Sequence, residues 1–359
     1  MNRIKFFLLL GSLMGSSLYA QRNTENLIIF TLDGMRWEEV FGGADSAIIN
    51  NPKYCRDKDE LNNRFGSNDP AVRRAKLFPF LWGTVAQQGQ LYGNRTIGNN
   101  VNNANRYWFS YPGYNEIFTG YPDTLVNSND KIRNKNTNVL EFLNHQKALQ
   151  GKIAVFSTWD AFPYILNKWR SGLYVNSDVD TLQFPGKEFQ LLNEIQFLTP
   201  KPTGVRPDIL TYMAGKQYLK AYKPKVLYIA FDETDDYAHS GMYDQYLGTA
   251  HAEDGMIGDL WNMIQSMPEY KDKTTLIVTC DHGRGNAIKD QWTDHGEKVL
   301  DAGQIWIAVM GPDTRATGEV KTPGLLYQEQ IAATLAKLLG YEFVAEHPVA
   351  RPIMQMYSK

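Results

Sequence analysis

The sequence is poor in cysteine and nearly balanced in charge. Cys55 and Cys280 are the two cysteines among 359 residues, so one disulfide is the most that the chain can form, and nothing in the sequence requires it. The 37 Lys and Arg against 39 Asp and Glu leave no basic excess for binding a nucleic-acid duplex. Repeats and low-complexity tracts are also lacking. The 43% of hydrophobic residues argues against disorder and is enough for one large core or two modest ones.

The first twenty residues differ from the rest of the chain. A positive start that includes Lys5 leads into an apolar run at 6–10, and small residues from 16 end at Ala20. This pattern predicts a secretory signal at 1–20 that is cut after Ala20. The apolar run is too short to span a membrane, and no cysteine lies near the cut to carry a lipid. We therefore expect an exported protein, periplasmic or secreted, with no membrane span once the signal is removed.

Apolar strand patterns alternate with helical patterns along residues 21–359. This alternation predicts one α/β domain with a mostly parallel central sheet flanked by helices. The Gly-, Asn- and Asp-rich stretch 40–75 is expected to be surface loop. Strands are expected at 26–32, 152–156, 225–230, 275–279 and 304–310, and helices at 78–88, 139–149, 207–222, 251–267 and 328–339.

Residues 159–205 are rich in Trp, Tyr, Pro and Asn and have weak periodicity. The stretch predicts an inserted cap, which could lie over the site and select the leaving group. Flat apolar surface for such a group would come from four aromatic residues, Trp159, Tyr164, Trp169 and Tyr174. The alternative is that these aromatics only pack an insertion onto the main domain.

Acidic residues stand at or just past the ends of three predicted strands. Asp33 follows the run 26–32 directly, and Asp281 with His282 follows the run 275–279. Asp235 comes shortly after the run 225–230. In parallel sheets the ligand site lies off the carboxyl ends of the strands, so these side chains should converge.

Histidine is scarce, and half of it lies in such acidic contexts. Of the six histidines, His239 comes four residues after Asp235, so both face one side of a helical turn. His282 follows Asp281, and His295 comes shortly after. His145, His251 and His347 have no acid at such spacing and are expected to be ordinary. Two divalent ions of the zinc class need about three protein ligands each. The expected sets are Asp235, His239 and His295 for one ion, and Asp33, Asp281 and His282 for the other.

Taken together, these motifs resemble those of the alkaline phosphatase superfamily, and most closely its type I phosphodiesterase/nucleotide pyrophosphatase branch. The resemblance rests on Leu32-Asp33-Gly34, on Thr234-Asp235 with His239, and on Cys280-Asp281-His282-Gly283 followed by His295. In that branch a Thr or Ser opens a segment with Pro two residues on and Thr-Gly at nine and ten. The matching residues here are Ser110, Pro112, Thr119 and Gly120.

The resemblance implies a two-metal hydrolase of small phosphoric esters, with Ser110 as the nucleophile and as a ligand of the metal at Asp33. Zinc is the expected metal, because well-placed histidines favour it over calcium. The branch often has an Asn near the phosphate about twenty residues after the nucleophile, and the stretch 127–134 leaves its identity open. The motifs also leave open whether monoesters or diesters are preferred.

Three other functions share parts of this pattern. A sulfatase would need Arg at position 114, where this chain has Tyr114, and would favour calcium. A phosphoglycerate mutase shares the metal motifs and the serine, but such mutases act in the cytosol and this chain carries an export signal. A binding protein on a degenerate scaffold is disfavoured because all six expected metal ligands are present.

Overall fold

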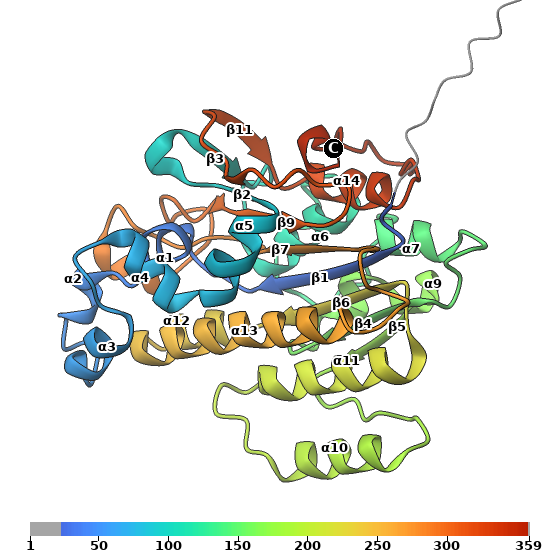
Figure 1. The fold of residues 1–359 in the computed structure, drawn as a ribbon, viewed down its shortest axis with the longest axis horizontal. Coiled ribbons are helices and arrows are strands. Elements are labelled where there is room, and N and C mark those ends of the chain that lie inside the picture. The colour runs from blue at the N-terminus through green and yellow to red at the C-terminus, as the bar shows by residue number, and fades with distance from the viewer. Residues whose placement is uncertain (1–22, 358–359) are drawn as a thin grey trace, which may run out of the picture.

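The computed structural model describes residues 23–357, so the predicted signal at 1–20 lies outside the described part. Its core is an eight-stranded sheet with the order β10-β2-β9-β7-β1-β6-β4-β5 (Figure 1). The five strands from β7 to β5 run parallel, whereas β9 is antiparallel to both of its neighbours. The strands are β1 (Asn26–Leu32), β2 (Gln90–Tyr92), β4 (Ile153–Ser157), β5 (Tyr174–Ser177), β6 (Val226–Phe231), β7 (Thr274–Thr279), β9 (Ile307–Met310) and β10 (Gly318–Glu319).

Helices cover both faces of this sheet, which confirms the predicted α/β fold. Strand β6 shows the arrangement, because neighbouring residues of a strand point to opposite faces. Tyr228 packs on Phe118 of helix α6, with 4.8 Å between ring centroids. Ile229 faces α11 and lies so close to Gly215 that a Cβ there would come within 2.8 Å of its Cδ1. The main helices are α6 (Ser110–Thr119), α7 (Val139–Asn144), α11 (Asp208–Tyr222), α12 (Glu233–His239), α13 (Tyr243–Ile264) and α14 (Gln330–Leu338).

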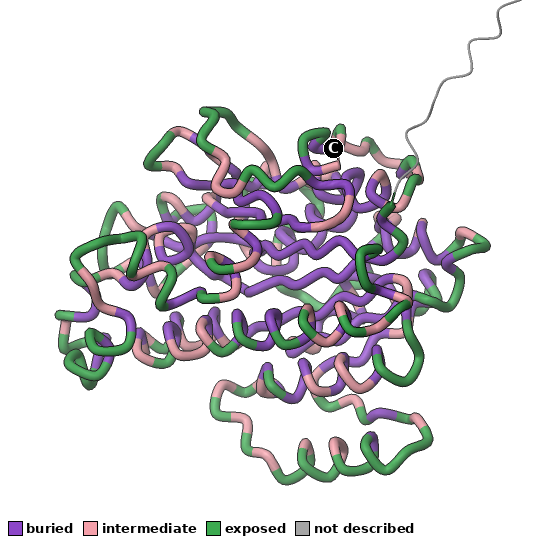
Figure 2. Tube along the Cα trace, viewed as in Figure 1, coloured by how far each residue is buried: buried purple, intermediate pink, exposed green. Residues whose placement is uncertain are grey.

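Burial follows these layers. The central strands β1, β6 and β7 are buried along their whole length, as their uninterrupted apolar runs predict (Figure 2).

A small second sheet joins β3 (Asn99–Asn102), β8 (Gln304–Ile305) and β11 (Gly324–Tyr327). Cys55 and Cys280 are both buried and unpaired. In the part of the chain that is described, no helix has the length and apolar character needed to cross a membrane.

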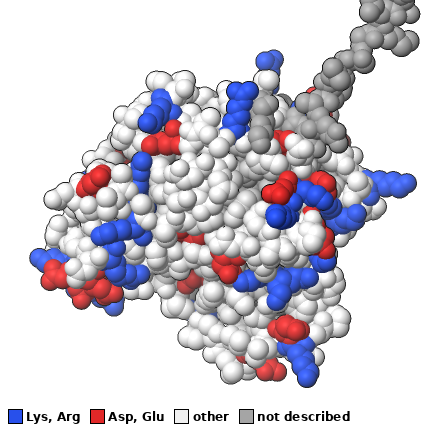
Figure 3. Space-filling view, viewed as in Figure 1, with Lys and Arg blue, Asp and Glu red and all other residues white. Residues whose placement is uncertain are grey.

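The surface carries charges of both signs. On the face drawn in Figure 3, acidic and basic side chains are interspersed. This mixture agrees with the formal net charge of -2.

The prediction of a surface loop at 40–75 is wrong. The stretch holds the second half of α1 (Trp37–Gly42), the short helices α2 (Ser46–Ile49) and α3 (Lys58–Phe65), and most of α4 (Pro70–Leu77). The polar residues that indicated loop are N-caps: the carboxylates of Asp45, Asp57 and Asp69 accept hydrogen bonds from the first turns of α2, α3 and α4.

The segment 159–205 is only partly separate from the sheet. Its strand β5 pairs in parallel with β4 and forms the sheet's edge, so this part belongs to the main domain and not to an insertion. Tyr174 opens β5 and stacks on Tyr218 of α11, at the strand end opposite to the predicted site. Trp159, in contrast, follows the carboxyl end of β4. Helix α10 (Lys187–Leu198) packs outside α11, below the sheet in Figure 1.

Candidate active site

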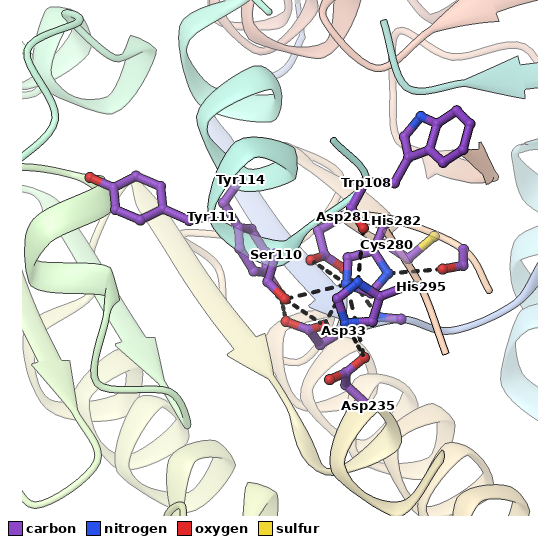
Figure 4. Close-up of polar contacts among 12 residues, drawn as sticks. Asp33, Trp108, Ser110, Tyr111, Tyr114, Asp235, Cys280, Asp281, His282 and His295 are labelled. Atoms are coloured by element: carbon purple, nitrogen blue, oxygen red, sulfur yellow. Dashed lines mark hydrogen bonds and ion pairs between the residues drawn. The ribbon is translucent and has the colours of Figure 1, made fainter. Parts of the chain in front are cut away.

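Three neighbouring central strands, β6, β1 and β7, bring the predicted residues together at the carboxyl ends of the strands. Strand β1 lies between β6 and β7, with Leu32 paired to Phe231 and Thr31 paired to Thr279. Asp33 therefore stands beside the start of α12 on one side and beside the turn after β7 on the other. Figure 4 shows Ser110, Asp33, Asp235, His282 and His295 pointing toward one another from these elements.

The predicted ligand set of Asp33, Asp281 and His282 is arranged around Nε2 of His282. This nitrogen lies 3.4 Å from Oδ1 of Asp33 and 3.4 Å from Oδ2 of Asp281. Ser110, the first residue of α6, places its Oγ 3.3 Å from the same nitrogen and 3.4 Å from Oδ1 of Asp33. The two carboxylates and the imidazole are buried and offer atoms within 4.8 Å of one another. The predicted nucleophile thus touches the predicted ligands of its metal.

The predicted set of Asp235, His239 and His295 lies directly beside the set of Asp33, Asp281 and His282. Oδ2 of Asp235 is 3.1 Å from Nε2 of His239, which in turn is 3.0 Å from Nε2 of His295. The ring of His295 stacks on that of His282 with 4.0 Å between centroids. Oδ1 of Asp235 is 3.9 Å from Nε2 of both His282 and His295. All six predicted side chains therefore form one continuous cluster, with His282 between the two sets.

Backbone carbonyls orient two of these imidazoles. Nδ1 of His282 lies 2.9 Å from the carbonyl oxygen of Gly283, and Nδ1 of His295 lies 2.9 Å from that of Trp108. A ring nitrogen that donates to a carbonyl leaves the other nitrogen with its lone pair, so Nε2 of each ring can bind a metal. Trp108 reaches this position with a φ of 50°, a left-handed conformation that costs a non-glycine residue roughly 1–2 kcal/mol.

The electrostatics of the cluster fit a cation. Burial, followed by the charges of Asp281 and Asp235, raises the pKa of Asp33 well above its ordinary value. Burial likewise raises the pKa of Asp281, whose Oδ2 is buried without a hydrogen-bond partner. Burial lowers the pKa of His282 well below its usual range and lowers that of His295 to about 4. Crowded carboxylates beside neutral imidazoles are the donor set that a zinc-class ion binds and whose repulsion it relieves.

Three residues that sequence patterns did not identify also shape the cluster. Tyr114 donates its hydroxyl proton to Oδ2 of Asp33 at 2.9 Å, one helical turn after Ser110. Arg284 is buried and bonds to the carboxylate and the carbonyl of Asp235. Oδ1 of Asn129 accepts a hydrogen bond of 2.9 Å from the backbone N–H of Tyr111, which holds this amide beside the first turn of α6. Arg284 directly follows the Asp281-His282-Gly283 motif, so its position in the sequence could have marked it as a site residue. Asn129 lies within the stretch 127–134, where an Asn near the phosphate was expected.

Tyr114→Phe is expected to weaken zinc binding about tenfold and to lower kcat without changing KM. Removing the hydroxyl leaves Oδ2 of Asp33 without this donor in a buried position, which costs about 1–2 kcal/mol. Zinc affinity measured with a competing chelator, beside steady-state kinetics, checks this. Tyr107→Phe is the matched control, because it removes a hydrogen bond of the same length to the carbonyl of Thr124. Equal zinc affinity in the two variants would contradict a role for Tyr114.

The fold is that of the alkaline phosphatase superfamily. It is similar to alkaline phosphatase PafA, with a TM-score of 0.62 and 11% identity over 94% of this chain and 99% of that one. It is also similar to murine ectonucleotide pyrophosphatase/phosphodiesterase 5 in complex with AMP, with a TM-score of 0.55 and 12% identity over 91% and 97%. A 2-O GAG sulfatase gives a TM-score of 0.58 and 14% identity over 90% and 72%.

Within this superfamily, the chain belongs to the type I phosphodiesterase / nucleotide pyrophosphatase family, whose family model matches residues 44–345. No curated protein sequence matches it. Family and fold together confirm the resemblance inferred from the motifs. The chain is a hydrolase of a superfamily that contains both phosphatases and sulfatases, and its own family indicates phosphate esters as substrates.

Proposed function

We propose that the protein is an exported two-zinc hydrolase of phosphoric esters in which Ser110 is the nucleophile. The observation that carries the proposal is the position of Ser110 Oγ, which lies 3.4 Å from Oδ1 of Asp33 and 3.3 Å from Nε2 of His282 at the amino end of a ten-residue helix. The positive end of a helix dipole favours an anionic group such as a phosphoryl group.

The cluster provides donors for two ions. Asp33, Asp281 and His282 would hold one, with Ser110 as a further ligand, and Asp235, His239 and His295 would hold the other. Zinc bound there supplies positive charge that lowers the pKa of a nearby hydroxyl and offsets charge on the phosphoryl oxygens. Ser110 Oγ donates a hydrogen bond to Oδ1 of Asp33 at 3.4 Å. The hydroxyl proton would pass to water and the leaving alkoxide would take a proton from water, so that Asp33 can keep holding the ion. Oγ then forms a bond to phosphorus while the bond from phosphorus to the leaving alcohol breaks, and water later hydrolyses the seryl ester.

Asn129 is the residue of the stretch 127–134 that we assign to the phosphoryl group. Its Oδ1 is engaged by the N–H of Tyr111, next to the nucleophile. The Nδ2 amide of the same side chain can therefore donate to a phosphoryl oxygen on Ser110.

We propose that residues around α6 select the leaving group. A cavity of about 220 Å³ adjoins Tyr111 and is lined by residues of the stretch 123–135, among them Leu125, Ile132 and Arg133. Of the four aromatic residues predicted to select the leaving group, Trp159 is linked to the site through Phe162, which contacts Trp159 and packs on Tyr114. We propose that this cavity and Trp159, and not the whole segment 159–205, contact the alcohol that leaves.

A substrate panel tests the proposed reaction. We expect purified protein to hydrolyse aryl phosphate monoesters or diesters at least a hundredfold faster than the matched aryl sulfate, because Tyr114 occupies the position where a sulfatase needs Arg. The matched esters share one leaving group, so their rates are compared by the same absorbance change. A preference for the sulfate would favour the sulfatase alternative instead. Location is tested separately, by finding the mature chain outside the cytoplasm with Gln21 at its amino end.

A further inference from the structure

Arg284 places a fixed positive charge against one of the two ligand sets. Its side chain is buried, and Nη2 donates to Oδ1 of Asp235 and to the carbonyl oxygen of the same residue at 3.1 Å. Nη1 donates to the carbonyl oxygen of Thr293 at 2.7 Å. Because two backbone carbonyls hold the guanidinium, it stays in place whatever binds to the carboxylate of Asp235.

The glycine at position 34 leaves room for the contact between Arg284 and Asp235. Gly34 follows Asp33 with a φ of +58°, and a Cβ at this position would come within 2.6 Å of Oδ1 of Asp235 and 3.0 Å of Nε of Arg284. Any side chain at position 34 would therefore separate the guanidinium from the carboxylate or displace both. The absence of a side chain at Gly34 is what lets Arg284 reach a predicted metal ligand.

The two ligand sets differ in the number of carboxylates and in the charge of the groups that contact them. The set Asp33, Asp281 and His282 has two carboxylates, and the partners of these carboxylates are neutral: the hydroxyls of Tyr114 and Ser110, the N–H of Gly34 and the His282 ring. The set Asp235, His239 and His295 has one carboxylate, to which Arg284 bonds directly. The charge of Arg284 also acts on His282 of the other set, but burial, His295 and Asp235 act more strongly on the pKa of that ring. Asp232 does not distinguish the sets, because its charge acts on both Asp33 and Asp235.

Solvent exposure adds to this difference. Asp33, Asp281 and His282 are at most 1% exposed. The side chain of His239 is 40% exposed, so water can compete for an ion held there. Arg284 also occupies Oδ1 of Asp235, which leaves Oδ2 as the oxygen that faces His239.

We propose that Arg284 makes the two ion positions unequal. The position at Asp33, Asp281 and His282 fills first, and the position at Asp235, His239 and His295 binds at least tenfold more weakly, because a dication there is repelled by a guanidinium that cannot move away. Occupancy of the second position, and with it turnover, then follows the free zinc concentration. This inference rests on the proposed two-zinc function and adds an order of loading to it.

Calorimetric titration of the chelator-stripped protein with zinc tests the order. The wild-type protein should give two steps of one equivalent each, separated at least tenfold in affinity. Arg284→Met keeps the aliphatic stem and removes the charge, so its weaker step should tighten at least tenfold. Arg284→Lys keeps the charge and should stay within about threefold of wild type. Thermal melting of each variant checks folding.

His239→Ala provides a second test that leaves Arg284 in place. It should remove the weaker step and keep the tighter one. The inference is overturned by two equal steps in the wild-type protein, by an unchanged or weaker second step in folded Arg284→Met, or by loss of the tighter step in His239→Ala. A protein that takes up no zinc at all contradicts the proposed function instead.

Discussion

Ser110→Ala is expected to lower kcat at least a hundredfold while zinc stays bound. In the proposed mechanism the Ser110 hydroxyl forms the bond to phosphorus, and its Oγ lies 3.3 Å from Nε2 of His282. Asp33, Asp281 and His282 remain in the variant and can still hold the ion. Water would then have to attack without a positioned nucleophile, and the loss of positioning accounts for roughly a hundredfold or more. Turnover of an aryl phosphoric ester and metal analysis of the same sample measure the effect.

Two further substitutions make this result specific. Ser110→Thr keeps a hydroxyl at the same reach and should retain part of the activity. Ser171→Ala removes another buried serine, at the end of α9 (Lys168–Ser171), and should leave kcat unchanged. If Ser110→Ala turns over substrate at nearly the normal rate with zinc bound, Ser110 is an ordinary polar residue and the proposed mechanism is wrong.

His282→Ala should have the largest effect, because this residue lies between both ligand sets. Its Nε2 is 3.4 Å from Asp33 and Asp281 and 3.9 Å from Asp235, and its ring stacks on His295. Loss of an outer-shell partner of a metal ligand typically costs 10–100-fold in affinity or activity. Loss of the ligand itself should therefore lower kcat roughly a thousandfold or more and reduce the bound zinc below two equivalents.

His145→Ala is the matched control, since His145 is exposed and lies outside both ligand sets. It should keep full activity and full zinc content. Thermal melting of both variants separates loss of metal from loss of fold. A folded His282→Ala protein that retains two zinc ions and normal turnover would contradict the assignment of His282.

The motifs predicted that the six side chains would come together because they lie on or directly after regular elements. Asp33 and Asp281 end neighbouring parallel strands, so strand pairing alone brings them together. Asp235 and His239 lie one turn apart on α12, so helix geometry alone gives them a common face. The six predicted ligands met in one cluster for these local reasons.

The contacts that tune the cluster depend on tertiary packing, which no spacing rule describes. Tyr114 meets Asp33 because α6 packs across β6, and Arg284 meets Asp235 because Gly34 leaves room for it. The predicted cap at 159–205 includes part of the main sheet for a similar reason. Tyr174 looked like part of an irregular aromatic stretch, but it opens a four-residue edge strand, and so short a strand has little periodicity to detect.

The most direct test of the central claim is the metal content of the purified protein, measured together with its activity. The ligand sets predict close to two zinc ions per chain, complete loss of phosphoric ester turnover on chelation, and recovery when zinc is returned. One bound calcium ion with no zinc, or turnover that survives removal of all metal, would contradict a two-zinc hydrolase.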